Sequence, residues 1–288
     1  MQITPRKAQS ALVLGGGGVT GIAWMTGIFA GLAQGGIASG DFERVIGSSA
    51  GAALGAQICA DLPIAALFAR QVETALQVAE MKPKLNYLRM AWTGFPAFLA
   101  RNNQALYLKR VGAMALKARG VAPAERLGVI AARLPSHDWP TRQDLACTAI
   151  NAATGVPVLF ERDSGVGLVD AVAASCAVPG VWPVVRINGD DYYDGALRTG
   201  ENADYAAGAK RVLIISPQST LKPGTGLSAE IDLLKAGGSH VALIQPNAAA
   251  RQAMGSNSLD PAQRAPSAQA GFAQAQNLAA KISAALGQ

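Results

Sequence analysis

The sequence has little of what most catalytic and metal sites use. It contains 2 histidines and 3 cysteines in 288 residues. The cysteines (Cys59, Cys147 and Cys176) stand far apart within apolar stretches, and this pattern favours buried free thiols over disulfides or a metal centre. We therefore expect neither a bound metal nor a disulfide.

The sequence also lacks the segments that carry a chain into or across a membrane. No run of about 18 uninterrupted apolar residues indicates a transmembrane helix. The polar residues 1–10 lead into a strand that is broken by four glycines, which makes a poor secretion signal. We expect a cytoplasmic protein that can also contact a membrane surface peripherally.

Charged residues are scarce, at 15% of the chain, whereas 50% of the residues are hydrophobic. This balance excludes a mainly disordered chain and supplies a sizeable core. The net charge of +6 favours acidic partners such as anionic lipid or nucleic acid. Because the basic residues are scattered and no zinc-finger or RNP-like motif is present, we expect no nucleic acid and keep the anionic membrane surface as a partner.

Apolar strands and helical segments alternate along much of the chain. The first of them are expected at 11–14, 22–33, 42–46 and 52–60. Later strands are expected at 144–150, 156–160, 184–187, 192–193, 211–215 and 241–244. Residues 61–134 indicate a mostly helical insertion, and residues 261–286 indicate a helical tail. Without a repeat or a clear linker, 1–288 is expected to be a single α/β domain.

Helix signals within the insertion are clear at several points. The first helix is expected to use Asp61 as its N-cap and to continue to residue 79. A second helix over 103–118 should end at Gly120, and a third is expected over 123–134. Residues 82–101 mix aromatic and basic side chains, which is typical either of a lid or membrane-facing surface or of a core helix.

The most informative stretch is Gly47-Ser48-Ser49-Ala50-Gly51, which follows an expected strand and precedes an expected helix. It fits the G-x-S-x-G nucleophile elbow, in which a serine occupies a tight strand-to-helix turn. Ser49 is therefore the candidate nucleophile. Such a serine needs a base for its proton and amides for the oxyanion, and the backbone N–H groups of Gly17, Gly18 and Ala50 are candidates for the oxyanion.

The glycine loop allows a second interpretation. Gly16, Gly18 and Gly21 form G-x-G-x-x-G directly after a strand, which is the dinucleotide-binding fingerprint. The acidic residue that holds the ribose is expected at the end of the second strand, where Ile46-Gly47-Ser48 stands instead. A Walker P-loop is excluded because no Lys-Ser/Thr follows Gly21. A nucleotide-binding protein stays as the alternative function.

Two kinds of residue could serve as the base. His240 opens a late strand in the order that a Ser-Asp-His hydrolase allows, whereas His137 lies in a polar loop. Asp194 stands at a strand end before the flexible Gly195, and burial beside a serine would raise its pKa toward the working range. Asp-Gly is also a common turn, so the residues themselves leave the base open.

Several blocks, taken together, resemble the patatin-like phospholipase family. They are the glycine loop, Gly47-Ser48-Ser49-Ala50-Gly51, the run from Ala174 to Val184, Tyr193-Asp194-Gly195-Ala196, and Ala206 to Lys210. The resemblance implies a three-layer α/β/α fold with a central, mostly parallel sheet. It implies a Ser49–Asp194 dyad without histidine, an oxyanion loop at Gly16, Gly17 and Gly18, and hydrolysis of lipid acyl esters through an acyl-enzyme, with no cofactor and no metal.

Two positions depart from the family pattern. Thr20 stands where the family usually has Lys or Arg, and Ala196 replaces the second glycine of Asp-Gly-Gly. The first change removes a cation from the surroundings of the oxyanion loop. It therefore prompts a third hypothesis, a weakly active or non-catalytic relative that binds lipid.

Overall fold

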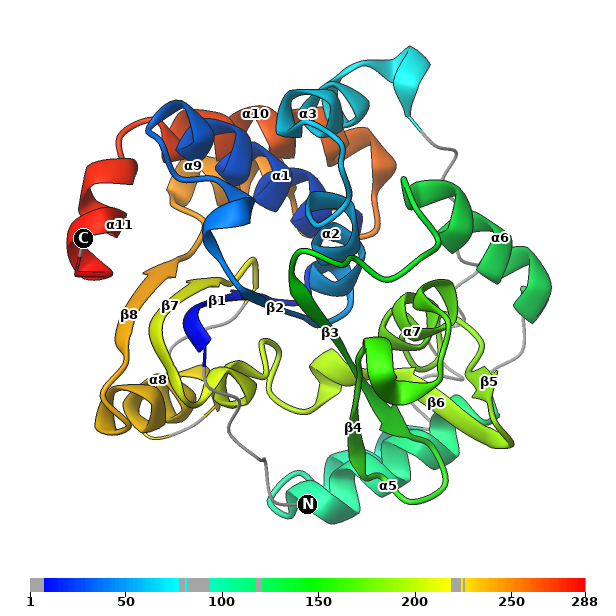
Figure 1. Ribbon diagram of the computed structural model, residues 1–288. Helices are drawn as coiled ribbons and strands as arrows, with labels where there is room; N and C mark the ends of the chain where they lie inside the picture. The colour runs from blue at the N-terminus through cyan, green and yellow to red at the C-terminus, as the bar shows by residue number, and fades with distance from the viewer. Residues whose placement is uncertain are drawn as a thin grey trace.

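The computed structural model describes residues 8–77, 81, 94–117, 121–218, 224 and 226–287. Within them, eight strands form one sheet that carries helices on both sides (Figure 1). The strands are β1 (Ala8–Leu14), β2 (Arg44–Gly47), β3 (Asp144–Asn151), β4 (Pro157–Phe160), β5 (Val185–Ile187), β6 (Asp190–Asp194), β7 (Ala209–Ile215) and β8 (His240–Ile244). The helices are α1 (Gly18–Gln34), α2 (Ala50–Ile58), α3 (Ile64–Val72), α5 (Gln104–Ala115), α6 (Pro123–Arg133), α7 (Leu168–Ser175), α8 (Gly226–Ala236), α9 (Ala248–Met254), α10 (Arg264–Ala275) and α11 (Ala279–Ala285).

The sheet is mostly parallel. Its order is β5-β6-β3-β2-β1-β7-β8, and β4 pairs with β3. The five strands from β3 to β8 in this order run parallel, whereas β4 and β6 are antiparallel to β3, and β5 is antiparallel to β6. The register places Leu14 of β1 level with Gly47 of β2 and Ile215 of β7. The loops after these strands therefore meet at one edge of the sheet, where α/β proteins bind ligands.

Strand residues alternate between two cores, one on each face of the sheet. Leu12 and Leu14 belong to the core that α1, α2, α7 and α10 cover. Ala11 and Val13 point to the other core, which contains Leu227 and Leu234 of α8. Figure 1 shows α1 and α10 on one side of the strands and α8 and α5 on the other. The expected three-layer α/β/α fold with a mostly parallel sheet is confirmed.

Helices α1 and α10 pack at very short range because glycines line their contact. A Cβ atom on Gly27 would lie 2.0 Å from the Ala268 carbonyl oxygen, and one on Gly31 would lie 2.7 Å from Cβ of Ala275. From the other helix, a Cβ on Gly271 would lie 2.2 Å from the carbonyl oxygen of Trp24. The C-terminal helices are thereby fixed against α1, the helix that begins at the glycine loop.

Some helix boundaries differ from the sequence expectations. Helix α3 has Pro63 as its N-cap, so the expectation that Asp61 caps it is wrong; the exposed Asp61 pairs with Arg142 at 3.3 Å instead. The helix also ends at Val72 rather than at residue 79, because Glu73 adopts extended backbone angles and a 3₁₀ turn follows at Thr74–Leu76. Helix α9 has no counterpart among the expected elements.

In the described part of the insertion, the regular elements are helices. It contributes α3, a short helix over 94–99, α5 and α6. Residues 82–93 of the expected lid or membrane-facing stretch, and Gly120, lie outside the described residues. In the described part of the chain, no helix has the length and hydropathy needed to cross a bilayer. The division into one domain with an insertion stays a prediction.

Candidate active site

Ser49 occupies a sharp turn between β2 and α2. Its backbone angles, φ 54° and ψ −117°, are strained for a residue with a side chain. Glycines make the turn sterically feasible: a Cβ on Gly51 would lie 2.0 Å from the Leu14 carbonyl oxygen, and one on Gly47 would lie 2.5 Å from Cα of Ala52. The strain and the two glycines are the features of a nucleophile elbow.

The segment at the end of α7 holds the Ser49 backbone. The Ser49 amide donates a hydrogen bond to Oγ of Ser175 at 2.9 Å, and Sγ of Cys176 donates to the Ser49 carbonyl oxygen at 3.2 Å. Both partners are buried. Cys176 therefore supports the turn through the Ser49 main chain.

Asp194, at the end of β6, meets Ser49 from the other half of the chain. The residue is 1% exposed. Burial raises its pKa to about 7, while hydrogen bonds from the Ser49 side chain and from the Ala196 amide (2.9 Å) act to lower the pKa. A carboxylate with a pKa near neutrality, hydrogen bonded to a serine, has the properties of a general base at physiological pH.

A buried polar network connects the two turns. Oγ of Ser48 accepts hydrogen bonds from Oγ1 of Thr148 at 2.8 Å and from Nδ2 of Asn202 at 2.9 Å. Asn202 also donates to the Gly195 carbonyl oxygen at 3.1 Å. A Cβ on Gly195 would lie 2.3 Å from Thr148 Oγ1. Asn202 is thus hydrogen bonded both to the residue beside Ser49 and to the residue beside Asp194, and Thr148 is bonded to the first and lies against the second.

The glycine loop faces the same point. A Cβ on Gly16 would lie 2.9 Å from Cβ of Ala196 and 3.6 Å from Cβ of Ser49. The Gly16 amide donates to the Gly200 carbonyl oxygen at 3.3 Å. Among the described residues, no backbone acceptor takes the amides of Gly17, Gly18 or Ala50, the last two of which begin α1 and α2. These helix N-terminal amides suit an oxyanion.

Protein atoms cover the loop where a dinucleotide would need to approach. Side-chain atoms of Pro217 lie 2.8 Å from a Cβ on Gly17, and the Ser258 carbonyl oxygen lies 2.6 Å from a Cβ on Gly18. In a dinucleotide site the corresponding backbone contacts the pyrophosphate. Furthermore, β2 runs into the serine turn rather than ending in an acidic residue. These contacts count against the nucleotide-binding alternative.

Neither histidine is placed to act on Ser49. His240 begins β8, three strands from β2 and at the opposite end of the parallel strands. Four residues along β8 and three strand spacings correspond to about 13 Å and about 14 Å. His137 is exposed, and its ring nitrogen contacts the Ala131 carbonyl oxygen at 3.1 Å. The fold thus brings the Asp194 carboxylate, and neither histidine, to the Ser49 side chain.

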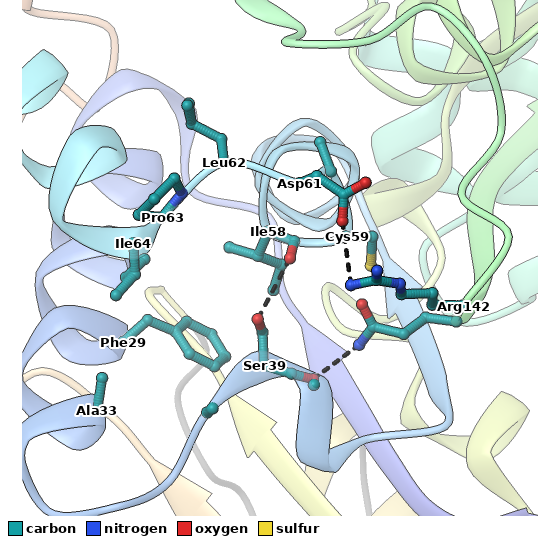
Figure 2. A pocket seen from close by; sticks show the side chains of 14 residues that line it. Phe29, Ala33, Ser39, Ile58, Cys59, Asp61, Leu62, Pro63, Ile64 and Arg142 are labelled. Atoms are coloured by element: carbon teal, nitrogen blue, oxygen red, sulfur yellow. Dashed lines mark hydrogen bonds and ion pairs between the residues drawn. The ribbon is translucent and has the colours of Figure 1, made fainter.

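The cavity at Ser49 is narrow, at about 30 Å³. Its lining includes Ile22, Ala50, Arg126, Arg133, Val178, Trp182 and Leu259. A larger cavity of about 580 Å³ lies at the far end of α2, where Figure 2 shows Ser39 bonded to the Ile58 carbonyl and Asp61 paired with Arg142. Its Cys59 thiol is a poor nucleophile because burial raises its pKa to about 12. Neither Ser49 nor Asp194 lines this larger cavity.

Comparison of the sequence with models of known protein families identifies the family of this chain. The family model described as Patatin-like phospholipase matches residues 12–207, more than half of the chain and the segment that holds Ser49 and Asp194. The chain belongs to the patatin-like phospholipase family. The search of curated protein sequences gave no match.

Solved structures show distant likeness to this patatin-like chain. VipD from Legionella pneumophila is 14% identical with a TM-score of 0.49, over 97% of this chain and 68% of VipD. The type III effector protein ExoU is 16% identical with a TM-score of 0.43, over 97% of this chain and 54% of ExoU. ExoU in complex with SpcU from Pseudomonas aeruginosa is 17% identical with a TM-score of 0.42, over 99% of this chain and 54% of the matched chain. The chain thus spans about half the length of the ExoU chains.

Sequence reasoning did not identify several residues of this patatin-like site. Arg126 and Arg133 lie on α6, and Ser258 and Leu259 lie beyond the family match. A pair of arginines two helical turns apart is an ordinary surface pattern, so only burial distinguishes it. Asn202 has a left-handed φ of 57°, and its role at the site likewise becomes visible only from its hydrogen bond to Ser48. In the described part of the chain, no group of three or more metal-ligating side chains gathers.

Proposed function

We propose that this patatin-like protein hydrolyses carboxylic esters of lipids with Ser49 as nucleophile and Asp194 as general base. The observation that carries the proposal is the strained elbow at Ser49 in hydrogen-bonded contact with a buried carboxylate whose pKa is about 7. A serine hydroxyl reacts only when a base takes its proton, and the Asp194 carboxylate is the base proposed here for Ser49.

The reaction follows from this placement. Oγ of Ser49 attacks the ester carbonyl carbon while Asp194 takes the hydroxyl proton, and the carbonyl oxygen becomes negative. The amides of Gly17, Gly18 and Ala50, at the starts of α1 and α2, stabilise that charge. When the C–O bond breaks, Asp194 returns the proton to the leaving alcohol, and an acyl-Ser49 ester remains. Asp194 then takes a proton from water, whose oxygen attacks the acyl carbon. When the bond between that carbon and Oγ of Ser49 breaks, Asp194 returns the proton to Oγ, which releases the fatty acid and regenerates the Ser49 hydroxyl and the Asp194 carboxylate.

An apolar cavity beside the site suits an acyl chain. It has a volume of about 470 Å³ and shares Val178 with the lining of the Ser49 cavity. Its walls also include Pro179 and Leu197, three residues beyond Asp194. The remaining lining comes from the insertion, at Gly94, Ala97, Phe98, Arg101, Tyr107, Val111 and Met114. Largely apolar walls with few polar groups are typical of lipid-binding cavities of this size.

The proposed activity can be tested on the unmodified chain. We expect it to release fatty acid from dioctanoyl phosphatidylcholine micelles, measured by mass spectrometry. A fluorophosphonate probe should label Ser49, located by peptide mapping, and should stop the release in proportion to labelling. Saturable binding of NAD(H) or FAD by a chain that resists the probe would instead support the nucleotide-binding alternative. Lipid binding without labelling or release would identify a non-catalytic relative.

We further propose that the insertion contacts an anionic membrane surface. Three large apolar side chains project from the helix over 94–99: Phe95, Phe98 and Leu99 are 58%, 57% and 61% exposed. The guanidinium of Arg101 lies 4.3 Å from the Phe98 ring centre. Apolar groups next to a cation are the composition of a helix that inserts into the headgroup region of anionic lipid. Phe98 also lines the apolar cavity, so this surface adjoins the proposed path of the acyl chain.

Replacing Phe95 and Phe98 together by serine should weaken binding to phosphatidylglycerol vesicles at least about tenfold, because each inserted phenylalanine contributes roughly 1.5–3 kcal/mol. Vesicle sedimentation measures this affinity. Leu233→Ser is the matched control, since Leu233 is 52% exposed on α8, outside the insertion. Equal losses in both variants, or none in either, would disprove membrane contact through 94–99.

A further inference from the structure

We infer that Asn202 is a positioning residue for the proposed reaction, because its side-chain amide fixes the turn at Ser49 relative to the turn at Asp194. The inference rests on the proposed function and adds to it a residue that acts through these two turns. Ser49 follows β2 and Asp194 ends β6, and the two strands lie on opposite sides of β3. The strands do not pair with each other, so contacts outside the sheet must set the distance between the two side chains.

Both ends of the Asn202 amide are engaged in the protein interior, where the residue is 1% exposed. Its Nδ2 atom donates to Oγ of Ser48 at 2.9 Å and to the Gly195 carbonyl oxygen at 3.1 Å. Its Oδ1 atom accepts a hydrogen bond from Nη1 of Arg198 at 2.9 Å. A primary amide has two N–H donors, and here each has an acceptor in a different turn. One planar group therefore bridges the residue before the nucleophile and the residue after the base.

Arg198 determines which way the Asn202 amide points. A guanidinium has donors only, so the amide atom that faces it must be the oxygen, and the nitrogen is then directed at the two turns. Arg198 is itself held by Asp204, whose two carboxylate oxygens accept from both terminal nitrogens of the guanidinium. The carboxylate of Glu230 on α8 lies 4.0 Å from the same guanidinium. The orientation of the amide is thus set by buried charges outside the turns that it holds.

The backbone at Asn202 restricts which residue can do this. Its angles, φ 57° and ψ 42°, are left-handed. Glycine, asparagine and aspartate adopt this conformation most readily, and of these three only asparagine carries N–H donors on its side chain. The position therefore combines a backbone that few residue types tolerate with a side chain that only one of them supplies.

The loop that carries Asn202 contacts the other parts of the proposed site as well. The Glu201 carbonyl oxygen accepts a hydrogen bond from Oγ of Ser48 at 3.3 Å. The Gly200 carbonyl oxygen accepts from the amide of Gly16 at 3.3 Å, in the glycine loop. The backbone of this loop thus reaches the nucleophile turn and the glycine loop, and the Asn202 amide adds the turn at the base. These contacts make the loop the common support of the groups that react.

A bridge of this kind should control the rate of the reaction rather than substrate binding. Proton transfer from Ser49 to Asp194 requires their oxygens to approach to about 2.6–3.2 Å. A misplacement of about 1 Å at a reacting group can cost about 10²-fold in rate. Among the described residues that line the Ser49 cavity and the apolar cavity, Asn202 is not included. We therefore expect kcat to depend on Asn202 and KM to be nearly independent of it.

Asn202→Gly removes the amide and retains the left-handed backbone. It should lower kcat for p-nitrophenyl butyrate, and the rate at which a fluorophosphonate labels Ser49, by about 10- to 100-fold, with KM changed less than about threefold. Asn202→Asp should lose about as much, because aspartate keeps the acceptor for Arg198 but has no donors. Asn188→Gly is the matched control: Asn188 has a φ of 50° in the exposed turn between β5 and β6, and this change should alter neither rate.

Circular dichroism and the melting temperature of each variant distinguish a loss of rate from a loss of folded protein. A lower melting temperature with unchanged kcat and labelling rate would make Asn202 a purely structural residue and overturn the inference. A raised KM with unchanged kcat would overturn it too. If Asn202→Gly does not fold, Asn202→Asp, which has nearly the same size and shape, decides by the same criteria. An unmodified chain that shows neither turnover nor labelling of Ser49 would instead disprove the proposed function, and the inference with it.

Discussion

Ser49→Ala is expected to lower kcat for ester hydrolysis by more than about 10⁴-fold while the chain stays folded, because no acyl-enzyme can form without the hydroxyl. The affected atom is small, and the turn around it does not depend on it. The backbone of the turn is held by Ser175 and Cys176 through main-chain groups of Ser49, which alanine retains. Turnover of p-nitrophenyl butyrate measures the loss, and the circular dichroism spectrum measures the fold.

Ser164→Ala provides the matched control for this change. Ser164 is exposed in the 3₁₀ turn after β4, and its hydroxyl donates to the Glu161 carbonyl oxygen. This variant should retain the turnover of the unmodified enzyme. Retained turnover in the Ser49 variant, with the protein pure, would exclude Ser49 as the nucleophile and leave the elbow as a structural turn.

Asp194→Asn is expected to lower kcat by about 10²- to 10⁴-fold, since it removes the group that accepts the Ser49 proton. In the unmodified enzyme, kcat/KM should rise with pH and level off above pH 7, because the carboxylate is a base only when ionised and its pKa is about 7. Turnover of p-nitrophenyl butyrate as a function of pH measures the loss of kcat in the variant and the pH dependence of kcat/KM in the unmodified enzyme. A profile that stays flat between pH 5 and 8 would show that another group supplies the base.

The same substitution should make the protein more stable at alkaline pH. The folded-state pKa of Asp194, about 7, lies above its ordinary value of 3.8, so the folded chain holds the proton more tightly than the unfolded chain. This contribution to stability is full below pH 4 and is lost as pH rises through 7, amounting to at most about 4 kcal/mol. Asparagine does not titrate. The free energy of unfolding of the variant should therefore exceed that of the unmodified protein at pH 8 and approach it at pH 4.

Urea unfolding at the two pH values measures this difference. Asp191→Asn is the control, since Asp191 lies on the same strand β6 but pairs with the exposed Arg186 at 2.9 Å. This control variant should show neither the loss of turnover nor the gain in stability at pH 8. If Asp194→Asn were equally destabilising at both pH values, the carboxylate would be a structural hydrogen-bond acceptor, and its burial would have no catalytic significance.

Burial of Asp194 and backbone strain at Ser49 each lower the stability of the folded chain, and both occur at the same site. A charged carboxylate away from water and a serine with positive φ are both destabilising, and proteins retain such features at sites that use them. The Ser48–Thr148–Asn202 network stabilises both turns at once. This shared support explains how two segments that are 145 residues apart by their numbers hold a defined relative position.

The sequence alone determined the local parts of this protein. The alternation of β1 and β2 with helices follows from the spacing of apolar residues along the chain. The glycines on both sides of Ser49 and the Asp-Gly pair at Asp194 can be recognised in the sequence as motifs. The family match, over residues 12–207, includes these segments. The end of α3 was misjudged because its apolar spacing continues past Val72 although the backbone does not.

Only the tertiary structure decided which groups meet. That Asp194 rather than His240 lies at Ser49 depends on strand order, since β6 pairs with β3 next to β2, while His240 begins the distant strand β8. The burial that raises the pKa of Asp194, and the burial of Arg126 and Arg133 at the same cavity, are likewise properties of packing. The physical reason is that desolvation and contact depend on the atoms around a side chain, and most of those atoms come from residues far away in the sequence.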